Sequence, residues 1–577
     1  MRGIFLKKRL DDILAAAEDP HCSLNRSLGP MHVTLLGIGA IIGAGIFATV
    51  GTAAAGDASR PGAGPSLILS FVITAVVCAF TALCYAEFAA MVPISGSAYT
   101  YSYATLGELV AWIIGWDLII EYAVGNVAVA ISWANYFKTF LHEYGVNIPD
   151  WISTDYETAS NIPHFFDTVP HFFGIPICCN VLAFGIVMLI TVVLVWGIKE
   201  SANFNAGMVM IKIVVLLFFV IIVLKHVPMA QMSTNWHPFQ PNGWNGTLAA
   251  AAVVFFAYIG FDAVSTVAEE CKNPATDLPI GIIGSLVVCT VLYVVVAAVF
   301  TGVVPFEQLK HLLSSEQAEP LIIAIHNAAP DLSYAAKIVA GGSVIAHTAV
   351  LLVYQLGQPR IFFSMARDGL LPSVFAKVHP KFKTPHITTI WTGVVVGLVS
   401  SFASIDEMVD LTNIGTLFAF VLVCLGIIIL RYKEPDRKRP FRVPGGPWLL
   451  PSLGIVSCLG LMVYLPPASW WRFAGWLVLG MSIYTSYGYV HSHLGTEFDR
   501  PRHVTGMLKL AAVGFLLVAI GMYTIPHDAS PLALVQQMGD TASPMHGRST
   551  IGVMMMLVGT VMAAWGLIMQ QSEKTPA

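Results

Sequence analysis

Charged side chains are scarce in this sequence. Asp, Glu, Lys and Arg make up 11 % of its 577 residues, whereas hydrophobic residues make up 56 %. An ordinary soluble domain carries about 25 % charged residues. A chain of this length and composition cannot hide its apolar side chains in soluble cores, so they must face lipid. The net charge of −4 is small and gives no indication of a nucleic-acid partner.

Several chemical motifs are also missing. The nine cysteines form no Cys-x-x-Cys pair, so neither a zinc site nor a disulfide framework is indicated. The sequence has no G-x-x-x-x-G-K-[ST] motif, which argues against an ATP-driven pump. No His or Asp cluster suggests a metal or another cofactor, and no nucleophile has a base nearby in the sequence. The basic residues Lys7, Lys8 and Arg9 are not followed by an apolar run, so we expect no cleaved signal peptide. We therefore expect a membrane protein that is not an enzyme.

Long apolar stretches dominate what is present. A membrane-spanning helix needs about 20 mostly apolar residues, and fourteen stretches approach that pattern. They are residues 32–55, 66–91, 109–137, 176–197, 205–225, 247–268, 280–303, 338–363, 386–403, 409–430, 448–465, 474–492, 508–525 and 550–570.

The positions of Lys and Arg predict the orientation of these stretches, because cytoplasmic loops are enriched in both. With the N-terminus placed in the cytoplasm, 22 of the 30 basic residues fall inside, seven fall outside, and Lys212 lies within the fifth stretch. The loop 139–178 has no Lys or Arg and is placed outside. The sequence thus predicts a multi-pass protein of the cell membrane (plasma or inner membrane) with cytoplasmic N- and C-termini, and an amphipathic segment over residues 1–30 on the inner surface.

The first apolar stretch is rich in glycine. Gly37, Gly39, Gly43 and Gly45 fall within nine residues, and each weakens a helix by roughly 1 kcal/mol relative to alanine. One interpretation is close helix packing, since Gly39 and Gly43 are four residues apart. The other is an unwound segment whose backbone amides and carbonyls hold a zwitterion.

The sixth stretch offers a counterpart to the first. It reads Phe255-Phe256-Ala257-Tyr258-Ile259-Gly260-Phe261-Asp262-Ala263, with a glycine among aromatic residues and a carboxylate deep in an apolar run. It lies five stretches after the first. Interrupted helices at matching positions of two five-helix halves indicate an inverted repeat with the substrate between the halves. We expect the repeats to cover residues 31–225 and 247–430, with four peripheral helices over residues 448–570.

A family resemblance supports this organisation. The run Gly37–Phe47, the segment Phe261-Asp262-Ala263 and the loop PRIFFSMARDGLLP from Pro359 to Pro372 resemble the amino acid–polyamine–organocation superfamily. Within it, the chain is most similar to bacterial members of the cationic amino acid transporter family, from about residue 5 to 490. The resemblance implies an all-α, LeuT-like membrane fold of about fourteen helices, in which helices 1 and 6 unwind in mid-membrane.

The resemblance also implies where the substrate binds. Its carboxylate would meet the amides of Gly43, Ala44 and Gly45, because half-helix N-termini attract anions. Its amino group would meet carbonyls of the two broken helices. A position near Leu351 in helix 8 would limit the size of the side chain. The carbonyls implied for the amino group belong to Ile42, Phe256, Ala257 and Ile259.

Three ionisable residues lie deep in apolar runs. Lys212 has about seven apolar residues before it and twelve after it, a depth that disfavours a snorkelling lysine. In proton-coupled relatives a lysine at the matching place of helix 5 stands where sodium-coupled relatives hold the ion, so the resemblance makes Lys212 the proton-coupling residue. Glu121 and Asp262 are each a gate, a proton relay or a structural acceptor for broken backbone. His347 in helix 8 faces an apolar run and is better explained as a satisfied core histidine than as a proton relay.

These observations favour a secondary transporter that carries small neutral or cationic L-amino acids together with protons, by alternating access. Two other functions remain open. An amino acid/amine exchanger needs no proton site and would make Lys212 purely structural. A non-transporting amino-acid sensor is disfavoured because sensors usually carry long cytoplasmic tails. The sequence settles neither the substrate nor the oligomeric state.

Overall fold

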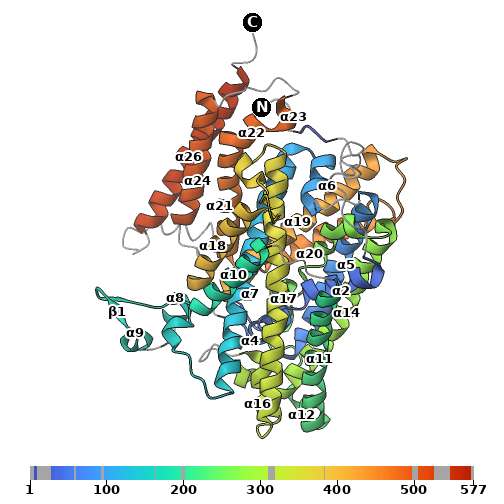
Figure 1. The fold of residues 1–577 in the computed structure, drawn as a ribbon, viewed down its shortest axis with the longest axis vertical. Coiled ribbons are helices and arrows are strands. Elements are labelled where there is room, and N and C mark those ends of the chain that lie inside the picture. The colour runs from blue at the N-terminus through green and yellow to red at the C-terminus, as the bar shows by residue number, and fades with distance from the viewer. Residues whose placement is uncertain are drawn as a thin grey trace.

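The computed structural model describes residues 5–8, 28–57, 60–92, 97–160, 162, 164–196, 202–309, 319–382, 384–496, 505–524 and 546–572 (Figure 1). Most of these residues are helical. Most of the expected amphipathic segment 1–30 lies outside the described residues.

The elements before the sixth apolar stretch are α2 (Pro30–Ile41), α3 (Ala44–Phe47), α4 (Thr49–Ala55), η1 (Gly64–Ser66), α5 (Leu67–Met91), α6 (Ser97–Thr105), α7 (Glu108–His142), η2 (Asp150–Ile152), α8 (Tyr156–Ser160), α9 (Phe165–Thr168), β1 (His171–Phe172), β2 (Ile175–Pro176), α10 (Val181–Trp196), α11 (Ala202–His226) and α12 (Met229–Asn235). The elements that follow are α13 (Gly243–Val254), η3 (Phe255–Tyr258), η4 (Asp262–Glu270), α14 (Pro274–Val303), α16 (Pro320–Ala328), α17 (Ser333–Arg367), η5 (Ser373–Ala376), α18 (His386–Phe402), α19 (Ile405–Lys433), α20 (Leu449–Val463), α21 (Pro467–Ile483), η6 (Tyr484–Gly488), α22 (Tyr489–His491), α23 (His493–Thr496), α24 (Gly506–Thr524) and α26 (His546–Ser572).

Each of the fourteen expected stretches coincides with helix in the structure. Among the described residues, nine helices are long and apolar enough to cross a membrane. The apolar helices α2, α10 and α18 are shorter, and α20 forms an angle of 117° with the helix that starts at Pro467. The chain is therefore a helical membrane protein with at least nine candidate spans.

The first stretch is interrupted at its glycine run. Helix α2 ends at Ile41, Ile42 is extended (φ −75°, ψ 102°), and helical winding resumes at Ala44 after the non-helical Gly43. The amides of an interrupted helix lose their partners four residues back. The break predicted from the glycine run is thus present, and it frees backbone groups at Gly39–Gly45.

The sixth stretch is interrupted as well. Helix α13 passes into the 3₁₀-helix η3, Ile259 is extended, and the chain continues as η4. Between them, Gly260 has φ +123°, a conformation that side chains of L-residues rarely adopt. A Cβ on Gly260 would also lie 2.9 Å from the carbonyl carbon and oxygen of Ala40 in α2. Glycine is required here for both reasons, and the two broken helices meet at this point.

Helices α24 and α26 stand apart from the rest. They lie side by side at the edge of the molecule, and α24 packs on α21 (Figure 1). Glycines bring their backbones together, because a Cβ on Gly514 would lie 2.4 Å from the amide nitrogen of Ala563. The other side of α26 carries exposed apolar residues, including Leu557 and Val561, as expected of a helix that faces lipid.

The acidic loop between α7 and α10 is partly structured. It contains η2, α8, α9 and the two-residue antiparallel strands β1 and β2. Asp155 is buried there, and its carboxylate accepts hydrogen bonds from the amide (2.9 Å) and hydroxyl (2.7 Å) of Thr158. At the tip of the hairpin, Phe173 is 92 % exposed.

Candidate functional site

Two buried side chains hold the carbonyls that are freed where helix α2 ends. The ammonium of Lys212, on α11, donates a hydrogen bond to the Gly39 carbonyl at 2.6 Å, and Lys212 is fully buried. The hydroxyl of Tyr293, on α14, donates to the Ile41 carbonyl at 3.0 Å. An unpaired buried carbonyl is costly, so these two donors stabilise the interrupted helix.

The second break is stabilised in the same way. The side-chain amide of Asn413, on α19, donates to the carbonyls of Ala252 (2.8 Å) and Val253 (3.2 Å) at the end of α13. On the other side of the break, the carboxylate of Asp262 accepts a hydrogen bond from the amide of Gly260 at 3.1 Å. Asp262 is therefore bonded to broken backbone, as a structural acceptor would be.

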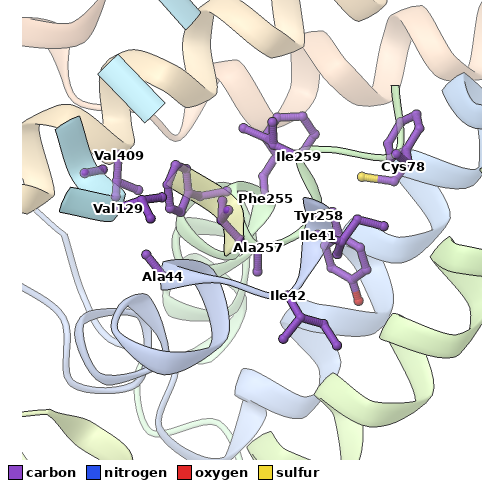
Figure 2. Close-up of a cluster of buried hydrophobic side chains, with 14 of the residues drawn as sticks. Ile41, Ile42, Ala44, Cys78, Val129, Phe255, Ala257, Tyr258, Ile259 and Val409 are labelled. Atoms are coloured by element: carbon purple, nitrogen blue, oxygen red, sulfur yellow. The ribbon is translucent and has the colours of Figure 1, made fainter. Parts of the chain in front are cut away.

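The two breaks lie against each other (Figure 2). A Cβ on Gly45 would lie only 2.2 Å from the Cα of Ala257. The broken first stretch (α2 to α4, called helix 1 below) and the broken sixth stretch (α13 to η4, called helix 6 below) therefore touch backbone to backbone. The residues expected to bind substrate in the two breaks are all buried and share this region: Ile42, Gly43, Ala44, Gly45, Phe256, Ala257 and Ile259.

Helix α17 approaches the first break through Val350. A Cβ on Gly43 would lie 2.9 Å from Cγ2 of Val350. Leu351, the position expected to limit side-chain size, is the next residue and is fully buried. Figure 2 shows three further apolar side chains, Val129, Phe255 and Val409, beside Ala44.

A small cavity lies beside the breaks. Its volume is about 10 Å³, room for a single water molecule. Glu121 and Asp262 both line it, and within the described residues Oε2 of Glu121 has no hydrogen-bond partner. The two deep carboxylates of the sequence are thus brought to one cavity. The other lining residues are Ala40, Tyr122, Ile259, Gly260, Ala263, Val353 and Tyr354.

His347 has a partner at each ring nitrogen. Its Nδ1 donates to the Ser343 carbonyl at 2.7 Å, and its Nε2 lies 2.7 Å from the Ser132 hydroxyl. The ring also packs against Phe47 and Tyr136, with centroids 5.6 and 5.5 Å apart. The neutral ring is satisfied at both nitrogens, as expected of a core histidine.

Ion pairs connect helix ends on either side of this region. Glu87, at the end of α5, is fully buried; it pairs with Arg431 and accepts a hydrogen bond from the amide of Val443 at 2.8 Å. In the loop after α4, Arg60 donates to Asp410 of α19 at 2.6 Å and to Asp57. Burial lowers the pKa of Arg60, but Asp410 and Asp57 outweigh burial and raise that pKa above its usual range.

Sequence reasoning missed Tyr293 and Asn413. Each has a detectable signal, because each is a polar group inside an apolar run: Tyr293 within VVCTVLYVVVAAV and Asn413 within DLTNIGTLFAF. The sequence does not indicate which carbonyl either one would reach.

A family model for amino acid permeases matches residues 28–483. The chain belongs to the amino acid permease family. The branched-chain amino acid permease BcaP of Bacillus subtilis is 46 % identical over 495 residues, 86 % of this chain and all of the relative. The methylthioribose transporter of the same organism is 41 % identical over 494 residues, again 86 % of this chain and all of the relative. The vacuolar cationic amino acid transporter 4 of Arabidopsis thaliana is 34 % identical over 444 residues, 76 % of this chain and 68 % of the relative.

These matches confirm the resemblance drawn from the three motifs. The region matched by the family model includes both broken helices, Lys212 and α17. Helices α24 and α26 lie after that region. The relatives are named as transporters or permeases, which supports a transport function over an enzymatic one.

Proposed function

We propose that this permease imports L-amino acids with small or branched apolar side chains, driven by protons. It lies in the cell membrane with both termini in the cytoplasm. Fourteen spans form two inverted five-helix repeats, residues 31–225 and 247–430, and the helices of residues 448–570 are peripheral. The proposal is supported by the agreement between the fourteen stretches and the observed helices, and by the two breaks five stretches apart.

The substrate backbone binds between the two breaks. Its carboxylate meets the amides of Gly43, Ala44 and Gly45, where helical winding resumes and the backbone is positive. Its ammonium meets the carbonyl of Ile42 and those of Phe256, Ala257 and Ile259. The contact of Gly45 with Ala257 supports this arrangement, because it brings both sets of backbone groups within reach of one small molecule.

The substrate side chain points toward α17 and α7. Val350 lies against Gly43, and Figure 2 shows Val129, Phe255 and Val409 on one side of Ala44. These apolar side chains favour alanine, valine or leucine over a cationic amino acid. The name of the relative BcaP agrees with this choice. Leu351 lines the same end of the site.

In this proposal Lys212 couples transport to protons. The main support is its hydrogen bond to the Gly39 carbonyl. The C-terminal end of a half-helix attracts a cation, and the charged lysine joins α11 to the end of α2 at 2.6 Å. Loss of the proton on the cytoplasmic side weakens this link and lets helix 1 move, which releases substrate inward. Glu121 and Asp262 stand at the neighbouring cavity as the gating or structural carboxylates.

Uptake in proteoliposomes tests the proposal. The wild-type protein is supplied with labelled leucine, alanine and lysine, and with methylthioribose because of the second relative, with and without an inward proton gradient. Gradient-driven accumulation of leucine or alanine is the expected result. Lys212→Met removes the charge, and Lys212→Arg fixes it at physiological pH, so both variants lose accumulation.

The matched control is Lys225→Met, an exposed lysine at the end of the same helix, which keeps wild-type accumulation. Accumulation at the wild-type rate in either Lys212 variant would falsify the coupling role. Gradient-independent exchange by the wild-type protein would identify an exchanger. Uptake of methylthioribose alone would overturn the amino-acid substrate.

A further inference from the structure

Tyr293 touches both broken helices and has no role in the function described so far. It is fully buried in the middle of α14, and its hydroxyl donates to the Ile41 carbonyl of helix 1 at 3.0 Å. Its ring packs edge-on against Tyr258 of the helix 6 break, with centroids 5.5 Å apart. One side chain from a third helix therefore contacts both halves of the proposed substrate site.

The partners of Tyr293 are themselves fixed. The Tyr258 hydroxyl donates to the Phe71 carbonyl of α5 at 3.0 Å, and the ring of Phe71 lies 5.6 Å from that of Tyr293. All three rings are fully buried. Because close-packed aromatic rings hold one another in place, the position of the Tyr293 hydroxyl is determined before substrate arrives.

The bond to Ile41 determines which backbone groups remain for a substrate. Ile42 is extended, so the carbonyls of Ile41 and Ile42 point to different sides of the chain. Tyr293 occupies the Ile41 carbonyl on the α14 side. The Ile42 carbonyl is then directed away from the Ile41 carbonyl and from the Tyr293 hydroxyl.

We propose that Tyr293 is a positioning residue for substrate recognition, which holds the unwound segment of helix 1 so that the Ile42 carbonyl faces the substrate ammonium. The inference rests on the proposed function, because it assumes that the substrate binds at this break. Tyr293 acts through Ile41 and does not itself touch substrate. Without its hydroxyl, Ile41 becomes a second free acceptor, the segment can rotate, and the ammonium is held less specifically.

Tyr293→Phe tests this role, because it keeps the ring contacts and removes only the hydroxyl. The matched control is Tyr484→Phe, which removes an equally buried hydroxyl that donates to Glu108 at 2.8 Å, far along the chain from either break. Counterflow of labelled L-leucine and L-alanine in proteoliposomes gives the apparent KM and the maximal rate without a proton gradient. Thermal melting in detergent gives Tm for each protein.

The loss of one hydrogen bond predicts a roughly three- to tenfold rise in KM for Tyr293→Phe, with the maximal rate kept. Both variants lose a buried hydrogen bond, so Tm falls in each, and it falls further in Tyr484→Phe because the lost acceptor is a carboxylate. KM changes only at Tyr293. The preference for L-leucine over N-methyl-L-leucine also shrinks in Tyr293→Phe, a change that a purely structural role would not produce.

Other outcomes overturn the inference. An unchanged KM in Tyr293→Phe, or an equal rise in Tyr484→Phe, means that Tyr293 only fills the core. An unchanged preference between leucine and its N-methyl derivative means that the hydroxyl does not act on ammonium recognition. If the wild-type protein transports neither amino acid, the proposed function fails, and this result is distinct from the failure of Tyr293 alone.

Discussion

Gly45→Ala should unfold or distort the contact between the two broken helices, whereas Gly43→Ala should leave the fold intact and alter the substrate site. The two glycines are two residues apart in the same motif, but their surroundings differ. A Cβ on Gly45 meets the Cα (2.2 Å), Cβ (2.6 Å) and amide nitrogen (2.8 Å) of Ala257. The three atoms nearest to a Cβ on Gly43 all belong to the side chain of Val350, the closest at 2.9 Å.

The distances give the size of each effect. An ordinary carbon–carbon contact is at least about 3.4 Å, so Gly45→Ala requires the facing backbones to separate by about 1.2 Å, a shift that no side-chain rotamer can supply. Overpacking a core costs about 1–3 kcal/mol, and a backbone obstacle puts Gly45→Ala at about 3 kcal/mol. Val350 can rotate or shift, so Gly43→Ala costs about 1 kcal/mol or less.

The assay measures folding and binding separately. Monodisperse yield and Tm in detergent report the fold, and equilibrium binding of labelled leucine reports the site. Gly45→Ala should lose yield and Tm, while Gly43→Ala should keep both and bind leucine more weakly. If Gly45→Ala has the wild-type Tm and affinity, the close contact of helix 1 with helix 6 is wrong. If Gly43→Ala binds normally, Gly43 serves packing alone.

Two more predictions concern selectivity and stability. Val350→Ala removes two methyl groups from the pocket and should raise uptake of leucine relative to alanine about tenfold, since even one methylene in an apolar pocket is worth about 1–3 kcal/mol. Leu351→Ser is the paired variant, and a larger shift there would make Leu351 the size filter. Arg60→Gln should lower the stability by about 3 kcal/mol, because it leaves the buried Asp410 without its cation. Thermal melts check this, and adding Asp410→Asn should restore part of the Tm, whereas a single variant as stable as the wild type would show that the pair contributes nothing.

Hydropathy and composition predicted the helices well, because a membrane span must be long and apolar along its whole length. The breaks were also predictable. Four glycines in helix 1 and Gly260 in helix 6 carry a local signal that depends on backbone conformation alone. Gly43 and Gly45 could not be told apart, however, because their difference lies in which atoms face them across the helix contact. That information belongs to Val350 and Ala257, more than 200 residues away in the chain.

The donors that hold the breaks were only partly predictable, for the same reason. Lys212 is conspicuous because an ammonium in an apolar run must have a partner. Burying the neutral side chain of Tyr293 or Asn413 costs less free energy than burying an ammonium, so neither residue stands out in the sequence. The loop 139–178 also holds a contact that the sequence does not indicate. Asp155 lies in this acidic loop, yet its carboxylate is buried and bonded to Thr158.

The three donors differ in one property that bears on the mechanism. Lys212, Tyr293 and Asn413 reach the broken helices from α11, α14 and α19, so three separate helices fix the carbonyls of the site. A tyrosine hydroxyl and an asparagine amide are neutral donors, and their bonds do not depend on a charge. Of the three, only Lys212 has a side chain that can carry a full charge at physiological pH. Its bond to Gly39 is therefore the one contact of the three that a proton can strengthen or weaken. Under the proposed function this gives a division of roles, in which the neutral donors keep the shape of the pocket and the lysine controls the movement of helix 1.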